Sequence, residues 1–289
     1  MPSNCTRFAS GATAPGPASG MRPDLRPRLF GGVLAALLAA LVIFAGGWLL
    51  LAALPLLIWG LVREWTALTM PRPTLHDHLA HAAAPLQVVA LFAFVHAMGW
   101  RVDGTAVTLA LILAAAVAVL VFAFVRARVE SPAFFSGAFY ITLPTLAFLW
   151  LRSADDGLER LIWLVCVVIA TDCAAYFVGS SVGGAKLAPR ISPGKTWSGL
   201  AGGAAGAAIT GAALSPFIAF GAASAAILAL ALALIAQGGD LFESWLKRRA
   251  GVKDSGTLIP GHGGLLDRLD GYMPALPVLA LVLATGGIS

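Results

Sequence analysis

Four polar side chains with helical spacing lie at the end of a long apolar segment near the C-terminus. They fall at positions i, i+3, i+4 and i+7, so a helix would place them on one face: Asp240, Glu243, Ser244 and Lys247. Asp267 and Asp270, three residues apart, would share a face in the same way. A lone carboxylate, Asp172, interrupts another apolar segment. Because ionisable groups in spanning helices are costly, these residues are functional candidates.

Basic residues and glycines follow the acidic ones in the sequence. A basic loop covers residues 186–197 and includes Lys195, and a later loop carries Lys253, His262 and the pair Gly263-Gly264. Carboxylates from several segments suit Mg²⁺, which takes one or two of them together with substrate phosphates. Lysine and arginine bind phosphate, and glycine-rich turns offer amide donors to anions. The combination indicates metal-assisted phosphoryl or nucleotidyl transfer.

Taken singly, several of these features have simpler explanations. Lys247-Arg248-Arg249 is typical of a positive anchor at a membrane surface, His262 of a turn, and Asp240 of a helix end. Two partial phosphate-loop patterns fail, because Ala185 and Pro189 stand where Lys and Gly are required. The histidines of the segment 76–81 (His76, His78 and His81) are predicted to lie in a polar loop between spans, which favours an interfacial segment over a metal site.

The composition restricts the class of protein. Of the 289 residues, 59% are hydrophobic and only 11% are charged, with a mean hydropathy of +0.86. So few charges cannot cover a water-facing surface, which excludes a soluble enzyme, a disordered protein and a nucleic-acid binder despite the net charge of +5. Three cysteines are too few for a disulfide framework. The chain is predicted to be an all-α polytopic membrane protein.

Apolar segments long enough to span a bilayer recur along the chain. Two of them are long enough to be divided, at Gly46-Gly47 and at Ser215-Pro216, which predicts about nine helices. With that count, 16 of the 19 Lys and Arg lie on one side and 3 on the other, which places the N-terminus in the cytoplasm and the C-terminus outside. The segments are 29–62, 82–100, 104–125, 131–151, 161–181, 196–239 and 271–289.

The chain is expected to divide into three regions. Residues 1–28 form a disordered tail, in which Met21 is an alternative translation start, and residues 29–160 form the N-terminal transmembrane helices. Residues 161–289 form the catalytic transmembrane region, with a polar cavity that faces the cytoplasm. Glycines of the segment 199–211 permit close helix packing, either internally or in a homodimer.

The segment 244–270 resembles the signature of the phosphatidate cytidylyltransferases. It matches S-x-[apolar]-K-R-x₄-K-D-x-[GSA], then [LIF]-[PGS]-x-H-G-G-[apolar]-x-D-R-[apolar]-D, at every position. Weaker resemblances are Gly239-Asp240-Leu241, the segment 192–199, the surroundings of Asp172, and Arg63-Glu64-Trp65. The sequence departs from the family at Cys173, Ser180 and Ser198, which puts substrate detail in doubt and leaves the reaction unaffected.

The resemblance implies Mg²⁺-dependent synthesis of CDP-diacylglycerol from CTP and phosphatidate at a bacterial inner membrane, with a second cation as an open alternative. It implies that Asp240 and Asp267 bind the metal, with Asp270 as a further carboxylate. Catalytic roles are implied for Asp240, Asp267, Asp172, Lys247 and Arg268. Substrate-binding roles are implied for Ser192, Lys195, Thr196, Ser244, Arg248, Lys253, His262, Gly263 and Gly264.

Other classes of protein share some of these features. An ion-coupled transporter would also carry Asp172, but it should show inverted repeats, and none is evident. A cytidylyltransferase acting on another lipid phosphate would share the signature, so only substrate tests separate it. The pattern of the CDP-alcohol phosphotransferases is absent, and retention of every acidic and basic position argues against an inactive scaffold.

Overall fold

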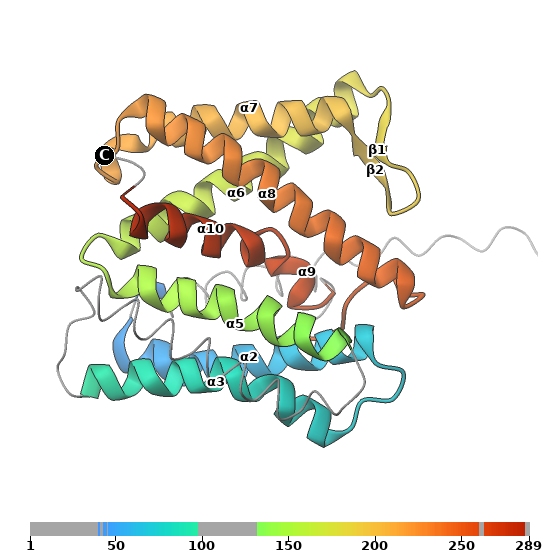
Figure 1. The fold of residues 1–289 in the computed structure, drawn as a ribbon. Coiled ribbons are helices and arrows are strands. Elements are labelled where there is room, and N and C mark those ends of the chain that lie inside the picture. Colours follow the sequence, from blue (N-terminus) through green and yellow to red (C-terminus); the bar gives the residue numbers. More distant parts are fainter. Residues whose placement is uncertain (1–39, 41–42, 45, 98–131, 260–262, 287–289) are drawn as a thin grey trace, which may run out of the picture.

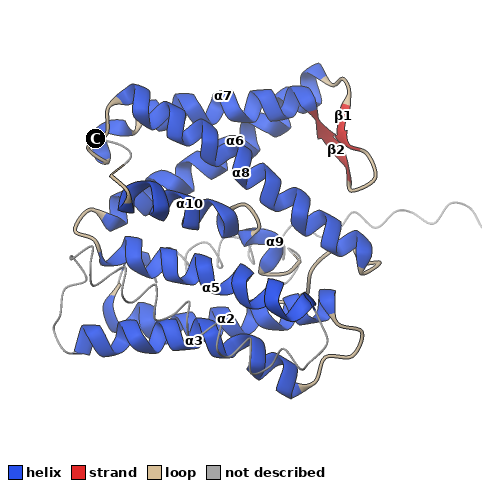
Figure 2. Ribbon diagram, in the orientation of Figure 1, coloured by secondary structure: helices blue, strands red, loops and turns tan. Residues whose placement is uncertain are grey.

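The computed structural model describes residues 40, 43–44, 46–97, 132–259 and 263–286, which are mostly helical (Figures 1 and 2). The N-terminal half contains α2 (Gly47–Thr69), α3 (Leu75–Ala97) and α5 (Pro132–Ser153). The C-terminal half contains α6 (Gly157–Val182), α7 (Trp197–Ala213), α8 (Ala222–Arg249), α9 (Leu266–Leu269) and α10 (Tyr272–Ala284). A 3₁₀ turn, η1 (Ser215–Phe217), and a hairpin of β1 (Lys186–Ala188) and β2 (Ser192–Thr196) complete the described elements.

The helices form two groups joined by α9 and α10. Helices α2, α3 and α5 pack around one hydrophobic cluster, which includes Ile58, Trp65 and Ile141. Helices α6, α7 and α8 pack around a second, which includes Leu164, Ala207 and Leu232. Figure 1 shows α10 between the two groups, and it contacts both α5 and α8.

The predicted break at Ser215-Pro216 is confirmed, and α2 begins at the predicted break at Gly46-Gly47, while most of the predicted helix before it lies outside the described residues. Gly46 and Gly47 have φ values of 60° and 52°, a left-handed conformation that interrupts a helix and that glycine adopts at little cost. Helix α7 ends at Ala213, the turn η1 follows at Ser215–Phe217, and α8 begins at Ala222. Four helices in the described part of the chain (α2, α3, α6 and α8) are long and apolar enough to cross a membrane. The chain is therefore a mostly helical membrane protein.

The basic loop that follows α6 contains a β-hairpin, whereas the sequence predicted an all-α fold. Strands β1 and β2 are antiparallel, with Lys186 opposite Thr196 and Ala188 opposite Ser192. Pro189 and Pro193 disfavour a helix here because proline lacks a backbone N–H donor. Strand β2 runs directly into α7, where the Thr196 hydroxyl accepts a hydrogen bond from the Gly199 N–H at 3.0 Å and caps the helix.

The glycines of α7 allow close packing inside the chain. A β-carbon at Gly203 would lie 2.9 Å from the Thr171 carbonyl oxygen of α6, and one at Gly199 would lie 2.9 Å from that of Ala175. At the other end of α7, a β-carbon at Gly211 would lie 2.8 Å from the Ala225 carbonyl oxygen of α8. These distances are too short for any side chain, so the small residues serve contacts of α7 with α6 and α8.

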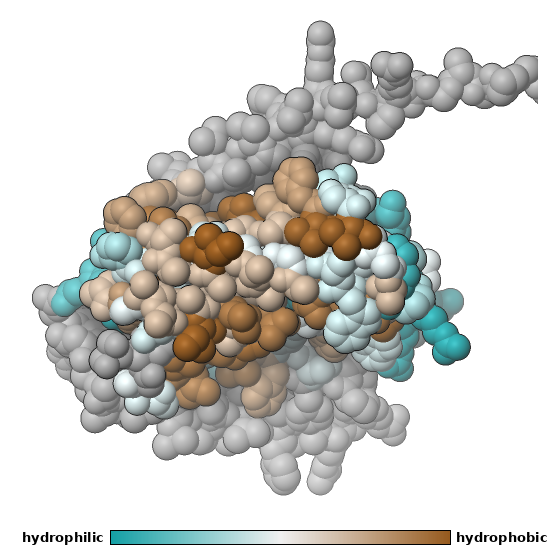
Figure 3. All heavy atoms as spheres, turned by 90° about the horizontal axis from the view of Figure 1, so that it is seen from above, coloured by the Kyte–Doolittle hydropathy of each residue, from teal (hydrophilic) through white to brown (hydrophobic). Residues whose placement is uncertain are grey.

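Apolar side chains cover much of the described surface. Ile209 on α7, Phe217 in η1 and Ile227 on α8 are each about 70% exposed. Figure 3, seen from above, shows apolar residues across the middle of this face and hydrophilic residues at both ends, most of them at the end where the hairpin lies. Exposure of so much apolar surface to water is unfavourable. This distribution therefore fits a protein whose flanks contact hydrocarbon and whose hairpin end contacts the aqueous boundary.

Two adjacent glycines in α8 offer a matched test of how closely α8 approaches the segment after α9. A β-carbon at Gly239 would overlap the Asp270 carbonyl oxygen and lie 2.7 Å from Cγ of Pro274, whereas nothing lies within 4 Å of one at Gly238. We expect Gly239→Ala to lower the free energy of unfolding by about 1–3 kcal/mol through overpacking. Gly238→Ala should be neutral or stabilising by up to about 1 kcal/mol, since alanine favours a helix. Thermal unfolding of both variants in detergent would measure this, and equal melting temperatures would contradict the close approach.

Candidate active site

Asp267 is the most extensively bonded carboxylate of the signature segment. Its Oδ2 accepts hydrogen bonds from the backbone N–H of Ser255 at 2.9 Å, the N–H of Gly264 at 2.8 Å and the Ser255 hydroxyl at 3.0 Å. Its Oδ1 accepts one from Lys247 Nζ at 2.6 Å. Burial by itself would raise the pKa of Asp267, but these donors outweigh burial and hold the pKa below its ordinary value. Asp267 is therefore ionised at neutral pH.

Lys247 lies between two carboxylates of different elements. Its Nζ is 2.6 Å from Oδ1 of Asp267 in α9 and 3.6 Å from Oε1 of Glu243, one turn earlier in α8. The Glu243 side chain has no exposed surface, and its carboxyl group lies against that of Asp270, so that a hydrogen bond between the two requires a proton on one of them. A buried acceptor of this kind fits a bound cation or a proton, because an unsatisfied buried charge is costly.

A second group of polar residues links the hairpin to α6 and α8. Lys195 Nζ lies 2.6 Å from Oδ2 of Asp240 and donates a hydrogen bond to Oε1 of Gln237 at 2.9 Å. The Gln237 amide in turn donates through Nε2 to Oδ1 of Asp172 at 3.0 Å. The network therefore joins the two carboxylates through one amide and one ammonium group, and the lone carboxylate of α6 belongs to the site.

Asp270 faces the same side of α8 as Asp267, as the i, i+3 spacing predicts. Burial raises the pKa of Asp270 to about 6, and the negative charge of Asp240 adds to this effect. The N–H of Gly271 donates to its Oδ1 at 2.7 Å. Asp240 and Asp267 are thus each paired with a lysine, whereas Asp270 has a raised pKa.

Gly263 and Gly264 lie directly against carboxylates of the protein. Gly263 has a φ of 84°, and a β-carbon there would lie 2.9 Å from Oδ2 of Asp267. At Gly264 a β-carbon would lie 2.6 Å from Oε2 of Glu64. The group that the backbone approaches here is a carboxylate of the protein itself, and contact of Gly263 and Gly264 with substrate stays a prediction.

The remaining predicted residues have varied surroundings. The Ser244 hydroxyl donates to Asp240 Oδ1 at 3.3 Å, which places it in the site. Arg248 Nε donates to the Ile191 carbonyl oxygen at 3.3 Å and ties the hairpin to α8. Lys253 and Arg268 are exposed, Ser192 lies in β2, and Thr196 serves as the cap of α7. His262 lies outside the described residues.

Sequence reasoning missed the roles of three residues. Gln237 lies three positions before Asp240 on an apolar helix, and a polar amide in a spanning segment is the signal that points to it. Ser255 belongs to the signature segment, and its backbone and hydroxyl both bond Asp267. Glu64 was noted only for its resemblance to the family, although it bonds the backbone of the signature segment.

The predicted polar loop around the first histidines is wrong, because residues 75–81 form the first turns of α3. Asp77 Oδ2 accepts a hydrogen bond from the Thr74 N–H at 2.8 Å, and the Asp77 N–H donates to the Thr74 hydroxyl at 3.3 Å. These reciprocal bonds form a capping box that starts the helix. His78 Nδ1 lies 2.8 Å from Thr66 Oγ1 and His81 Nδ1 lies 2.7 Å from the Asp77 carbonyl oxygen, so both have structural contacts.

The donor chemistry of the site fits a hard cation. Its carboxylates supply the oxygen ligands that Mg²⁺ prefers, and two of them, Glu243 and Asp270, lie against each other. Within the described part of the chain, however, no three His, Cys, Asp or Glu side chains stand together as a ready-made ligand group. One oxygen of Asp240 and one of Asp267 are each paired with a lysine at 2.6 Å. The residues therefore suit a cation that shares its ligands with substrate phosphates.

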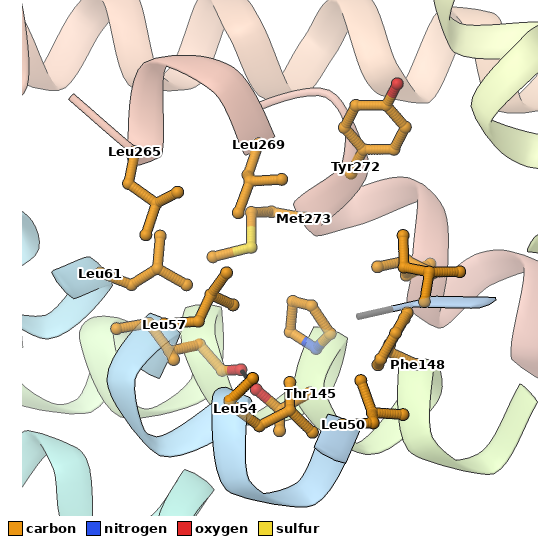
Figure 4. Close-up of a pocket in the computed structure, with 15 residues that line it drawn as sticks. Leu50, Leu54, Leu57, Leu61, Thr145, Phe148, Leu265, Leu269, Tyr272 and Met273 are labelled. Atoms are coloured by element: carbon orange, nitrogen blue, oxygen red, sulfur yellow. Dashed lines mark hydrogen bonds between the residues drawn. The ribbon is translucent and has the colours of Figure 1, made fainter. Parts of the chain in front are cut away.

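An apolar pocket of about 320 Å³ lies behind the acidic segment (Figure 4). Leu265 and Leu269, on either side of Asp267 in sequence, point into it together with Leu61 and Met273. The turn α9 thus presents leucines to this pocket and carboxylates to α8. The polar cavity predicted for the site is a different feature and stays a prediction.

Comparison with known proteins identifies the family. Apolar helices of spanning length and a site of carboxylates paired with lysines define a membrane protein with a charged site between its helices. A profile described as the cytidylyltransferase family matches residues 26–285. The chain belongs to the cytidylyltransferase family.

Relatives with assigned names match one half of the chain. The phosphatidate cytidylyltransferase of Brucella melitensis is 50% identical over 149 residues, which is 50% of this chain and 55% of that protein. That of Bacillus subtilis is 41% identical over 155 residues, 51% of this chain and 56% of that protein. The chain therefore spans about half the length of the curated relatives it matches.

Proposed function

We propose that the protein is a phosphatidate cytidylyltransferase, which converts CTP and phosphatidate to CDP-diacylglycerol and pyrophosphate. The proposal rests on two ion pairs in a chain of the cytidylyltransferase family. Lys247 Nζ lies 2.6 Å from Asp267 Oδ1, and Lys195 Nζ lies 2.6 Å from Asp240 Oδ2. Similarity to proteins named phosphatidate cytidylyltransferase supports the choice of substrates. The site lies where helices and the hairpin meet, and the proposal requires that a soluble nucleotide and a membrane lipid both reach it there.

The reaction joins two anions, so charge neutralisation and alignment supply most of the catalysis. A phosphate oxygen of phosphatidate attacks the α-phosphorus of CTP, and the bond to the bridging oxygen of pyrophosphate breaks. The second pKa of a phosphate monoester is about 6, so the attacking group is already ionised near neutral pH and needs no strong general base. The side chains of the site therefore bind and orient rather than form a covalent intermediate.

Each side chain has a role in this scheme. Asp240 and Asp267, with Asp270 nearby, would hold Mg²⁺, which when bound supplies positive charge to the triphosphate. Lys195 and Lys247 hold these carboxylates in place and offer ammonium groups to the phosphates. Arg248, Lys253, Arg268 and His262, with the hydroxyls of Ser192, Thr196 and Ser244, would contact the substrates. Asp172 acts through Gln237, to which it is bonded, and so orients Lys195.

The membrane arrangement is part of the proposal. Nine spans, with the N-terminus in the cytoplasm and the C-terminus outside, place the hairpin and the signature segment on the cytoplasmic side of a bacterial inner membrane. CTP would reach them there, while phosphatidate would arrive from the bilayer. A homodimer stays part of the proposal, and its interface would lie on the apolar flanks, because α7 uses its glycines within the chain.

The decisive experiment supplies purified protein in detergent with phosphatidate, radiolabelled CTP and Mg²⁺. We expect label in a lipid product, and we expect a chelator of divalent cations to abolish it while added Mg²⁺ restores it. Product formed only from another lipid phosphate would retain the chemistry and change the substrate. Absence of lipid product with every lipid phosphate and nucleotide would refute the proposal.

A further inference from the structure

Glu64 of α2 is a buried carboxylate that bonds the backbone of the signature segment. Only 6% of the residue is exposed. Its Oε1 accepts a hydrogen bond from the N–H of Leu265 at 2.9 Å, and its Oε2 accepts one from the N–H of Leu266 at 2.7 Å. These two amides lie at the start of α9, where a helix has no backbone acceptors of its own. A residue of the N-terminal half therefore fixes the turn that carries Asp267.

The Ser255 hydroxyl connects the two carboxylates. It lies 3.1 Å from Oε2 of Glu64 and 3.0 Å from Oδ2 of Asp267, and Ser255 is itself buried. A hydroxyl has one proton, so it donates to only one of the two oxygens at a time. The backbone N–H of Ser255 donates to Asp267 throughout. Glu64 and Asp267 thus share one serine, and the placement of one depends on that of the other.

Two glycines of the signature pack directly on Glu64. A β-carbon at Gly256 would lie 2.6 Å from its Oε1, and one at Gly264 would lie 2.6 Å from its Oε2. Any larger residue at either position would displace the carboxylate from the amides it accepts. The glycines are therefore required by contact with a residue far earlier in the chain.

A carboxylate is a costly choice for filling space between helices. A buried charge is unfavourable unless hydrogen bonds compensate it, and an apolar side chain of similar volume would fill the same space. What a carboxylate adds is two acceptor atoms that bind two consecutive backbone amides and a hydroxyl. Glu64 therefore acts by positioning, because the groups that it bonds (the Ser255 hydroxyl and the amides of Leu265 and Leu266) hold Asp267 in place.

We propose that Glu64 is a positioning residue, which holds the start of α9 and Ser255 so that the Asp267 carboxylate is aligned for the cation and the phosphates. The inference rests on the proposed function for the role of Asp267. The inference goes beyond the proposed function because it assigns a residue of the N-terminal half, in α2, to the assembly of the site. Groups that orient metal ligands typically contribute about 10–100-fold in metal affinity or activity.

The test uses Glu64→Gln, which keeps the shape of the side chain but replaces one acceptor by an NH₂ group that faces an N–H donor. We expect the Mg²⁺ concentration for half-maximal activity to rise about 10–100-fold, with a smaller change in the KM for phosphatidate. Glu159→Gln is the matched control, since Glu159 is exposed in the first turn of α6 and should leave the Mg²⁺ dependence unchanged.

A second measurement does not depend on turnover. Hydrogen exchange of a peptide covering residues 255–268 should be slowed by Mg²⁺ in the wild type, and this protection should be weakened in Glu64→Gln, while peptides from α6 and α7 exchange as before. Wild-type Mg²⁺ dependence and wild-type protection in the variant would overturn the positioning role. If the wild type makes no lipid product yet shows Glu64-dependent protection by Mg²⁺, the proposed function fails and the positioning role holds.

Discussion

Replacement of Asp267 by asparagine is expected to reduce lipid-linked nucleotidyl transfer by at least about 10²–10³-fold, as found when one preorganised electrostatic group is removed from an active site. Both oxygens of Asp267 act as acceptors, Oδ1 for Lys247 and Oδ2 for the amides of Ser255 and Gly264. Asparagine offers one acceptor and one donor, so it must oppose either the ammonium group or the two amides. It also removes the charge proposed to bind Mg²⁺.

The fold of Asp267→Asn should persist. Lys247 retains Glu243 as a partner at 3.6 Å, so no ammonium group is left without a carboxylate. Elution from size-exclusion chromatography and the melting temperature in detergent would establish this alongside the activity. Asp155→Asn, in the exposed turn before α6, is the matched control and should keep full activity. Near wild-type turnover of Asp267→Asn would refute the role assigned to this carboxylate.

Features with local causes were predictable from the sequence. The breaks at Gly46-Gly47 and Ser215-Pro216 depend on residues that interrupt a helix where they stand. The shared face of Asp267 and Asp270 follows from helical spacing alone. The capping box of Thr74 and Asp77 is also a local signal, and reading it would have placed the first histidines on a helix.

Features that depend on distant partners were not predictable in the same way. The spacing of α8 placed Asp240 and Lys247 on one face, but only the packing of the hairpin brings Lys195 to Asp240 and only that of α9 brings Asp267 to Lys247. Glu64 bonds residues about 200 positions later, and no periodicity in either segment points to the other. The family resemblance indicated which residues belong to the site, but it did not indicate which lysine pairs with which carboxylate.

Replacement of Lys247 by methionine should have the largest effect on stability. Lys247 is the cation near both Glu243 and Asp267, whose side chains are 0% and 8% exposed. Methionine keeps the length of the side chain but leaves two buried carboxylates without their ammonium partner. Removing one partner of a buried ion pair typically costs about 3–5 kcal/mol, because the remaining charge stays desolvated. We therefore expect a marked fall in the melting temperature of the detergent-solubilised protein.

A double variant separates charge from packing. In Lys247→Met/Glu243→Gln one of the two carboxylates that lost their ammonium partner is replaced by a neutral amide, while Asp267 keeps its donors from Ser255 and Gly264. Part of the lost stability should therefore return, and the coupling free energy from the double-mutant cycle should be favourable. Arg249→Met is the control, since Arg249 is exposed at the end of α8 and interacts there with the Trp245 ring. If Lys247→Met alone melts like the wild type, the ion pairs contribute little to stability. If it melts lower and the second substitution restores nothing, the loss arises from packing rather than from the buried charge of Glu243.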